Sequence, residues 1–201
     1  MKHLALAPAL ILALALPVAA EKLPLGQISG YLNAMTTAQS KFTQVNDDGS
    51  ITTGTLYIKR PGRVRFEYDP PEAALVLAGA NTVAVFDNNS NTGPTTYPLE
   101  RTPLSIILAA KVDLNRARMV TGHREDGNTT AVTTQDPAHP EYGSLELVFT
   151  GPPVELRQWV ITDDSGARTT VILGALDIGL PLSDNLFNIA LTESQTGRDQ
   201  R

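Results

Sequence analysis

Most of the chain consists of short segments in which apolar and polar side chains alternate, separated by clusters of turn-forming residues. Alternation places every second side chain on one face of a strand, and closely spaced turns connect neighbouring strands as hairpins. This pattern predicts a meander of antiparallel strands. The turn clusters are DDGS at 47–50, RPG at 60–62, DNNSNTGP at 87–94, EDGN at 125–128, TGPP at 150–153 and DDSG at 163–166.

Eleven segments have the composition and length of strands, and we expect an antiparallel sheet of about ten strands with helices lying against it. If such a sheet curls into an incomplete barrel, helices would plug its concave side. The predicted fold is therefore mainly β with a few α-helices. The expected strands lie near 41–46, 52–60, 63–69, 74–79, 82–87, 94–98, 118–125, 129–135, 143–150, 154–162 and 167–177.

Two segments carry helical rather than alternating spacing. In residues 25–39 apolar side chains recur three and four positions apart, at Leu25, Ile28, Leu32 and Met35, which predicts an amphipathic helix. In residues 102–117, Thr102 has the chemistry of a helix cap and Pro103 suits the first helical position. The apolar stripe of this second predicted helix consists of Leu104, Ile107 and Leu108, and it could extend to Val112.

The first twenty residues have the features of a cleavable secretory signal. Lys2 precedes a Leu- and Ala-rich stretch, and the small residues Val18 and Ala20 suit a cleavage site after Ala20. A retained membrane anchor is the weaker alternative, because the apolar run is short and prolines interrupt it. We expect residues 21–201 to form a single domain, exported to the periplasm of a Gram-negative bacterium.

Composition limits the classes of partner. The formal net charge is −5 and no cluster of basic residues is present, which argues against nucleic-acid binding. Aromatic residues make up 5% of the chain, so an apolar cavity would be lined mainly by aliphatic side chains, which suit acyl chains. The chain contains no cysteine, hence no disulfide and no thiol nucleophile. The polar C-terminal stretch TESQTGRDQR is expected to be loose.

No residue pattern indicates catalysis. The sequence has neither a GxSxG motif nor a glycine-rich phosphate-binding loop. Of the histidines beyond the signal, His123 ends a predicted strand, whereas His139 lies near Asp136 and Glu141 in the stretch DPAHPE. These three side chains could form a metal site, but the two prolines favour an ordinary turn. We therefore expect no enzyme activity, no metal and no cofactor.

The stretch GTLYIKRPGRVRFEYD, residues 54–69, predicts a hairpin with one apolar face. On its second strand Arg63, Arg65 and Glu67 are expected to face water. The inward set is Leu56, Ile58, Val64, Phe66 and Tyr68.

Arg60 follows Leu56 and Ile58 with the same parity and is therefore predicted to lie on the apolar face. A guanidinium on such a face needs hydrogen-bond acceptors, because burying it unpaired costs several kcal/mol. The alternative is a solvated arginine beside a turn. Trp159 is expected to be a structural residue.

Several stretches, in this order, resemble one known family, the periplasmic outer-membrane lipoprotein carrier LolA. The block KRPGRVRFEY is the most specific of them. The resemblance covers nearly all of the chain beyond the signal. Its landmarks are FTQ at 42–44, GTLYIKRPGRVRFEYDPP at 54–71, VFD at 85–87, TPLSIIL at 102–108, the run from Trp159 to Thr170 and LSDNLFNI at 182–189.

The resemblance implies a half-barrel with helices forming a lid over an apolar cavity for lipoprotein acyl chains. It implies that Arg60 latches the lid by hydrogen bonds to backbone carbonyls of the lid helices. The implied partners are acylated lipoproteins, an inner-membrane lipoprotein-releasing ABC transporter and an outer-membrane lipoprotein acceptor, with the carrier itself a monomer. The chain departs from the family pattern at Val64, where an entrance-lining aromatic is usual, and at Phe66, often a tryptophan.

Two other functions are also compatible with the sequence. A sensor or lipid-binding adaptor on the same half-barrel would report envelope stress instead of delivering cargo. A secreted hydrolase would depend on catalytic residues that the motifs do not reveal, with His123 and His139 as the first to test.

Overall fold

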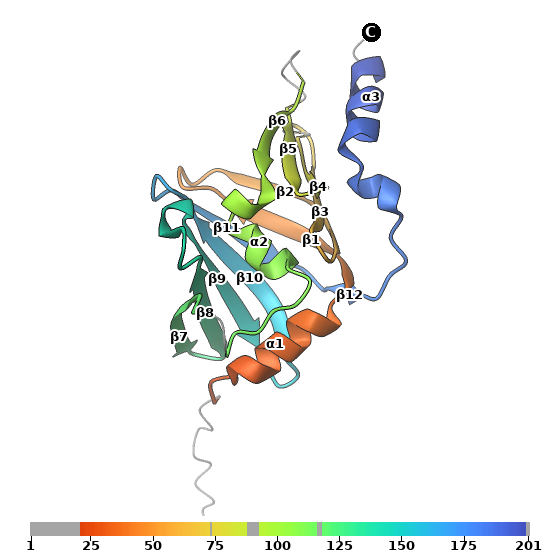
Figure 1. Cartoon of the computed structure of the whole chain (residues 1–201). Helices are drawn as coiled ribbons and strands as arrows, with labels where there is room; N and C mark the ends of the chain where they lie inside the picture. The colour runs from red at the N-terminus through yellow and green to blue at the C-terminus, as the bar shows by residue number, and fades with distance from the viewer. Residues whose placement is uncertain (1–20, 73, 88–92, 116–117, 200–201) are drawn as a thin grey trace, which may run out of the picture.

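The computed structural model describes residues 21–72, 74–87, 93–115 and 118–199. The expected signal sequence, 1–20, lies outside the described residues. Within these ranges the chain forms one twelve-stranded antiparallel sheet, three α-helices and three short 3-10 helices (Figure 1). None of the helices described is both long and apolar enough to cross a membrane.

Strands and turns follow one another along the chain as the turn clusters predict. The strands are β1 (Thr37–Val45), β2 (Ile51–Lys59), β3 (Arg63–Tyr68), β4 (Leu75–Gly79), β5 (Thr82–Phe86), β6 (Thr95–Pro98), β7 (Val120–Asp126), β8 (Thr129–Gln135), β9 (Ser144–Thr150), β10 (Glu155–Thr162), β11 (Arg168–Leu173) and β12 (Asp177–Ile178). The helices are α1 (Leu25–Ala34), η1 (Leu99–Arg101), α2 (Leu104–Leu108), η2 (Pro140–Tyr142), η3 (Asp184–Phe187) and α3 (Ile189–Asp199).

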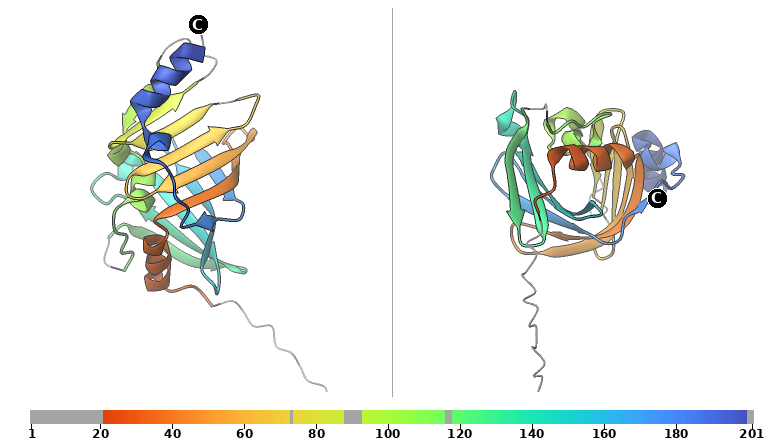
Figure 2. Two further views of the ribbon diagram at one scale, coloured as in Figure 1. Left: turned by 90° about the vertical axis from the view of Figure 1, so that its right-hand side faces the viewer. Right: turned by 90° about the horizontal axis from the view of Figure 1, so that it is seen from below.

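The sheet consists of two meanders joined side by side. Its strand order is β6-β5-β4-β3-β2-β1-β11-β10-β9-β8-β7, and β1 pairs with β11 so that Phe42 lies opposite Leu173. The sheet curves into an open trough that does not close, with α1 and α2 lying across the opening (Figure 2). β6 and β7 lie at opposite edges of the sheet, and the chain between them contains η1 and α2. The predicted incomplete barrel covered by helices is thus confirmed.

All eleven predicted strand segments contain a strand, with two differences. The first strand begins at Thr37, four residues before the prediction, because Thr37 pairs with Lys59 of β2. The last predicted segment, 167–177, divides: β11 ends at Leu173, and Asp177–Ile178 pairs with β1 as the separate strand β12. The sheet therefore has twelve strands in place of about ten.

Both predicted helices are shorter than expected. The first ends at Ala34, not at residue 39, because residues from Thr37 onward pair in the sheet. Of the second, predicted at 102–117, residues 116 and 117 lie outside the described residues, and residues 102–115 retain a helix only at Leu104–Leu108. The predicted cap is also wrong: the Thr102 hydroxyl donates to the carbonyl of Leu99 at 2.8 Å and does not cap α2.

A second, smaller apolar cluster lies on the convex face, where η3 packs on the sheet. It contains Leu77, Ala84, Phe86 and Phe187. A β-carbon at Gly79 would lie 2.3 Å from the Phe187 carbonyl oxygen, so this close approach requires glycine.

The C-terminal segment differs from the prediction. The stretch from Thr192 to Asp199 is helical and belongs to α3. The charges predicted to face water also have protein partners: Arg63 pairs with Asp184 at 2.6 Å, and Arg65 donates to the Leu186 carbonyl at 3.0 Å. The outer face of β3 is therefore partly covered.

Candidate apolar site and its lid

The concave face of β2 and β3 forms one apolar wall. Register places Leu56 opposite Phe66 and Ile58 opposite Val64, and all four side chains are buried. Tyr68 is half-buried at the end of this row, and its hydroxyl donates to the Gln44 side chain at 2.8 Å. Burial raises the pKa of Tyr68 to about 12, although the Gln44 hydrogen bond acts in the opposite direction. The five residues predicted to face inward thus share one surface.

Aromatic rings continue this wall across the junction of the two meanders. Phe66 packs edge to face against Phe42 on β1, with ring centroids 5.4 Å apart, and against Trp159 on β10 at 6.2 Å. Trp159 is fully buried, and no described group accepts a hydrogen bond from its indole nitrogen. Its surroundings are those of a packing residue.

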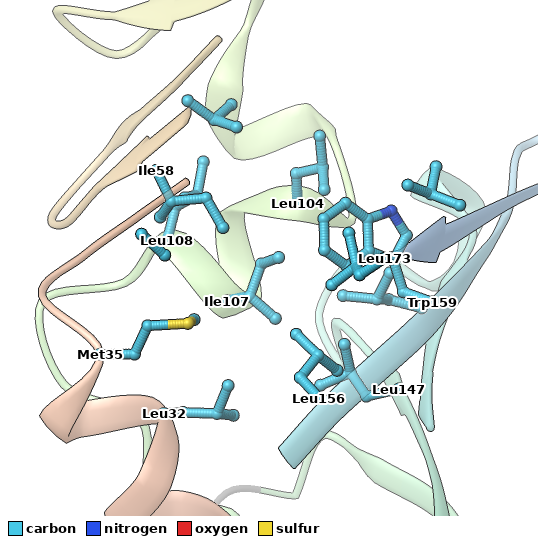
Figure 3. Close-up of a cluster of buried hydrophobic side chains, with 14 of the residues drawn as sticks. Leu32, Met35, Ile58, Leu104, Ile107, Leu108, Leu147, Leu156, Trp159 and Leu173 are labelled. Carbon is cyan, nitrogen blue, oxygen red and sulfur yellow. The ribbon is translucent and has the colours of Figure 1, made fainter. Parts of the chain in front are cut away.

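The helix α2 directs its apolar stripe into the trough. Leu104, Ile107 and Leu108 are buried, and they lie among side chains from α1 and from both meanders (Figure 3). On one side of Ile107 lie Leu32 of α1 and Met35, directly after that helix, and on the other side lie residues of the opposite strands. Full burial of each such side chain contributes about 1.5–3 kcal/mol. The same stripe therefore both covers the concave face and forms part of its core.

Arg60 joins the sheet to both helices. It lies at the β2–β3 turn with 9% of its surface exposed, and its guanidinium donates to the Leu32 carbonyl of α1. Nη2 also donates to the Ala109 carbonyl, directly after α2, at 2.6 Å. Burial lowers the pKa of Arg60, although the group stays charged because arginine titrates far above neutral pH. The Nε atom has no hydrogen-bond partner among the described residues.

Two backbone hydrogen bonds reinforce this connection. The amide of Arg60 donates to the Thr36 carbonyl, and the amide of Gly62 donates to the Leu108 carbonyl, both at 2.8 Å. The turn at residues 60–62 is thus bonded through main chain to the end of α2 and to the link between α1 and β1. One short turn of the sheet is therefore bonded to both lid segments.

Two polar residues of α1 escaped the sequence analysis. Asn33 and Ser29 bind the backbone of the segment after α2, at Val112 and Leu114. Because these side chains and Arg60 take up backbone groups of residues 109–114, that segment does not continue the helix. The available signal was weak: two polar residues four positions apart, beside the apolar positions Ile28 and Leu32.

The histidines lie apart from the apolar site. His123 Nε2 is 2.9 Å from the Leu23 carbonyl, and His139 Nδ1 is 2.9 Å from Glu141 Oε1. Asp136 accepts from the amide of Ala138 in the same turn. In the part of the chain that the structure describes, no group of three metal-ligating side chains converges.

A groove of about 240 Å³ lies beside α2. Ile106, Ala109, Met119 and Tyr142 contribute to its lining. Ile106 is only half-buried, unlike its neighbour Ile107, so adjacent residues of α2 have different surroundings.

The fold and the site define a class: an open antiparallel half-barrel whose apolar concave face is covered by a helical lid bonded to one arginine. The chain belongs to the outer membrane lipoprotein carrier protein LolA family, whose sequence model matches residues 33–190. This match confirms the resemblance drawn from the sequence.

Individual relatives are distant. The outer-membrane lipoprotein carrier protein of Coxiella burnetii is 25% identical over 179 residues, 80% of each chain. That of Pseudomonas aeruginosa is 24% identical over 155 residues, 73% of each chain. Among solved structures, a LolA superfamily protein from Nitrosomonas europaea matches with a TM-score of 0.44 and 10% identity, over 85% of this chain and 98% of that chain. MucB in complex with MucA(peri) matches with a TM-score of 0.41 and 13% identity, over 81% and 57%.

Proposed function

We propose that this protein is a periplasmic carrier that binds the acyl chains of lipoproteins at its concave face and delivers them to the outer membrane. Family membership supports the proposal, as do the names of its relatives and the expected signal at residues 1–20. The role is binding and transfer, with neither catalysis nor a cofactor.

The observation that carries the proposal is the position of Arg60, bonded to both lid helices above an apolar wall. Moving an acyl chain from a membrane into water costs about 0.8 kcal/mol per methylene. A carrier must therefore supply an apolar surface, and it must cover that surface when no cargo is bound. A lid fulfils both needs if it can be displaced.

The strength of the connection suits a displaceable lid. A hydrogen bond to a charged group contributes about 1.5–3 kcal/mol. The two carbonyl contacts of Arg60 thus amount to a few kcal/mol, less the cost of burying the guanidinium. Burial of several methylenes of an acyl chain offsets the free energy of these two hydrogen bonds. In this proposal Arg60 is the latch, Leu104, Ile107 and Leu108 form the inner side of the lid, and Leu56, Ile58, Val64, Phe66 and Tyr68 contact acyl chains.

The chemistry of the cargo defines the partners. An inner-membrane ABC transporter that releases lipoproteins would load the carrier, and an outer-membrane acceptor would receive the cargo. A monomer is sufficient for this role, since one trough with its lid encloses the site.

A release assay tests the proposal. The purified protein lacking residues 1–20 is incubated with inner-membrane vesicles that contain the transporter, a labelled lipoprotein and ATP. We expect an ATP-dependent, soluble one-to-one complex. If the lipoprotein stays in vesicles from which an established carrier releases it, the carrier function is wrong, and a sensor or adaptor role on the same half-barrel becomes the better explanation.

A further inference from the structure

We propose that Asn33 is a positioning residue that joins α1 to the segment after α2, so that the two helices open as a single lid. The inference rests on the proposed function for its role in transport, and it concerns a residue outside the predicted latch. Its basis is a set of hydrogen bonds between the helices that does not involve the sheet.

The Asn33 side chain binds both backbone groups of one residue. Its Nδ2 donates to the Val112 carbonyl at 2.7 Å, and its Oδ1 accepts from the Val112 amide at 2.9 Å. An asparagine amide can make this pair because it carries a donor and an acceptor side by side. Two bonds to one residue fix the orientation of the segment as well as its distance from α1.

Ser29 extends the connection by one helical turn. Its hydroxyl accepts from the Leu114 amide at 3.0 Å and donates to the Leu25 carbonyl of α1 at 2.8 Å. Residues four apart lie on the same face of a helix, so Ser29 and Asn33 form one polar row. The side chains of Val112 and Leu114 are buried in the main core, which adds apolar contact to the polar row.

This connection is separate from the one made by the β2–β3 turn. Arg60 and Gly62 bond the sheet to the helix ends, at Leu32, Ala109 and Leu108. The bonds of Asn33 and Ser29 join one lid segment to the other and include no strand residue. The two sets approach each other only where Arg60 Nη2 lies 3.5 Å from Asn33 Oδ1, a long and weak contact.

The consequence concerns how the lid opens. Breaking the Arg60 bonds loosens the lid at the β2–β3 turn but leaves α1 and the segment after α2 joined. An entering acyl chain that displaces either helix therefore displaces both carbonyls to which Arg60 donates, those of Leu32 and Ala109. Without Asn33 the two helices would move separately, and α2 could open while Leu32 stayed bonded.

Amide hydrogen exchange of the protein without cargo tests this arrangement. The Gly62 amide reports the sheet-to-lid connection, and the Val112 and Leu114 amides report the helix-to-helix connection. In Arg60→Leu we expect Gly62 exchange to rise about tenfold or more while Val112 and Leu114 change by less than about threefold. In Asn33→Ala we expect exchange at Val112 and Leu114 to rise about tenfold or more while Gly62 changes by less than about threefold. Gln27→Ala, at an exposed α1 position, should leave the exchange of all three amides unchanged.

Two exchange results would overturn the inference. One is equal acceleration of all three amides in Arg60→Leu, which leaves Asn33 intact and therefore decides the question even if Asn33→Ala does not fold. The other is unchanged Val112 exchange in Asn33→Ala.

A distance measurement adds a readout that a purely structural role would not change. The chain has no cysteine, so spin labels can be attached through Gln27→Cys and Ala110→Cys, both exposed positions. When a synthetic triacylated lipopeptide is added, we expect the distance between the two labels to stay constant with Asn33 present and to lengthen in Asn33→Ala. A longer distance with Asn33 present would contradict a one-piece lid. Failure of the lipopeptide to bind would count against the carrier function, while the exchange data would still decide the role of Asn33.

Discussion

Lys59 and Arg60 are consecutive residues that bind to opposite sides of the half-barrel. Lys59 Nζ lies 2.7 Å from the Asp184 carboxylate and 2.6 Å from the Leu182 carbonyl on the convex side. The Arg60 guanidinium donates to the two lid carbonyls on the concave side. Side chains of successive strand residues point to opposite faces, so one short turn can be bonded on both. The residue next to the proposed latch is therefore bonded to the C-terminal segment on the convex face.

Substitutions at two neighbouring residues of α2 should distinguish the side that faces the trough from the side that faces the groove. Ile107→Asp places a carboxyl group among buried side chains, where acyl chains are proposed to bind, and should weaken lipopeptide binding about tenfold or more. Ile106→Asp is the matched control: Ile106 is one residue away, half-buried, and lines the groove beside α2. This variant should bind the lipopeptide nearly as the wild type does. Titration of a fluorescent lipopeptide, with circular dichroism to verify folding, measures both. Wild-type binding by Ile107→Asp would show that α2 does not contact cargo.

Two glycines should respond oppositely to the same change. Gly79→Ala forces a β-carbon toward the Phe187 carbonyl, displaces η3 and should lower the free energy of unfolding by about 1–3 kcal/mol. Gly30→Ala, in α1 with open space around its added methyl group, should raise it by about 0.5–1 kcal/mol. Urea denaturation of the two variants gives the values. An unshifted midpoint for Gly79→Ala would mean that η3 does not dock as described.

Stability should fall in acid partly through Glu146. The hydrogen bond from Arg124 lowers the pKa of Glu146 below its ordinary 4.5, against the opposing effect of burial. A lowered folded-state pKa gives stability that is complete above pH 4.5 and is lost as the pH falls through the folded-state value. The pair is partly exposed, so the loss should be at most about 1 kcal/mol.

Denaturation curves of the wild type and Glu146→Gln at pH 7 and pH 3 test this. The variant should lose less stability on acidification. An equal loss in both proteins would assign the acid sensitivity to other carboxylates.

The sequence predicts those parts of the fold that local patterns determine. Alternation located the strands, and the parity of Leu56 and Ile58 placed Arg60 on the inner face, because the alternation of side chains along a strand is a property of the local backbone. The non-helical course of residues 109–114 involves instead Asn33 and Ser29, which bind Val112 and Leu114 from 79 and 85 positions away. No local propensity indicates such a partner.

The convex cluster escaped prediction for a similar reason. Phe187 is buried only because η3 returns to β4, where Gly79 leaves room for its backbone. Likewise, Arg63 and Arg65 alternate as water-facing residues do, but each also has a partner in the returning C-terminal segment.

Delivery by Arg60→Leu tests the central claim most directly. The wild type and the variant are loaded with the same labelled lipoprotein, mixed with outer-membrane vesicles that contain the acceptor, and the lipoprotein transferred is measured over time. Closure of the lid after release favours delivery, so losing even one bond of about 1.4 kcal/mol should shift the partition roughly tenfold toward the carrier. We therefore expect normal loading and at least tenfold poorer delivery by Arg60→Leu. Delivery at the wild-type rate and extent would contradict the role of Arg60 as the latch.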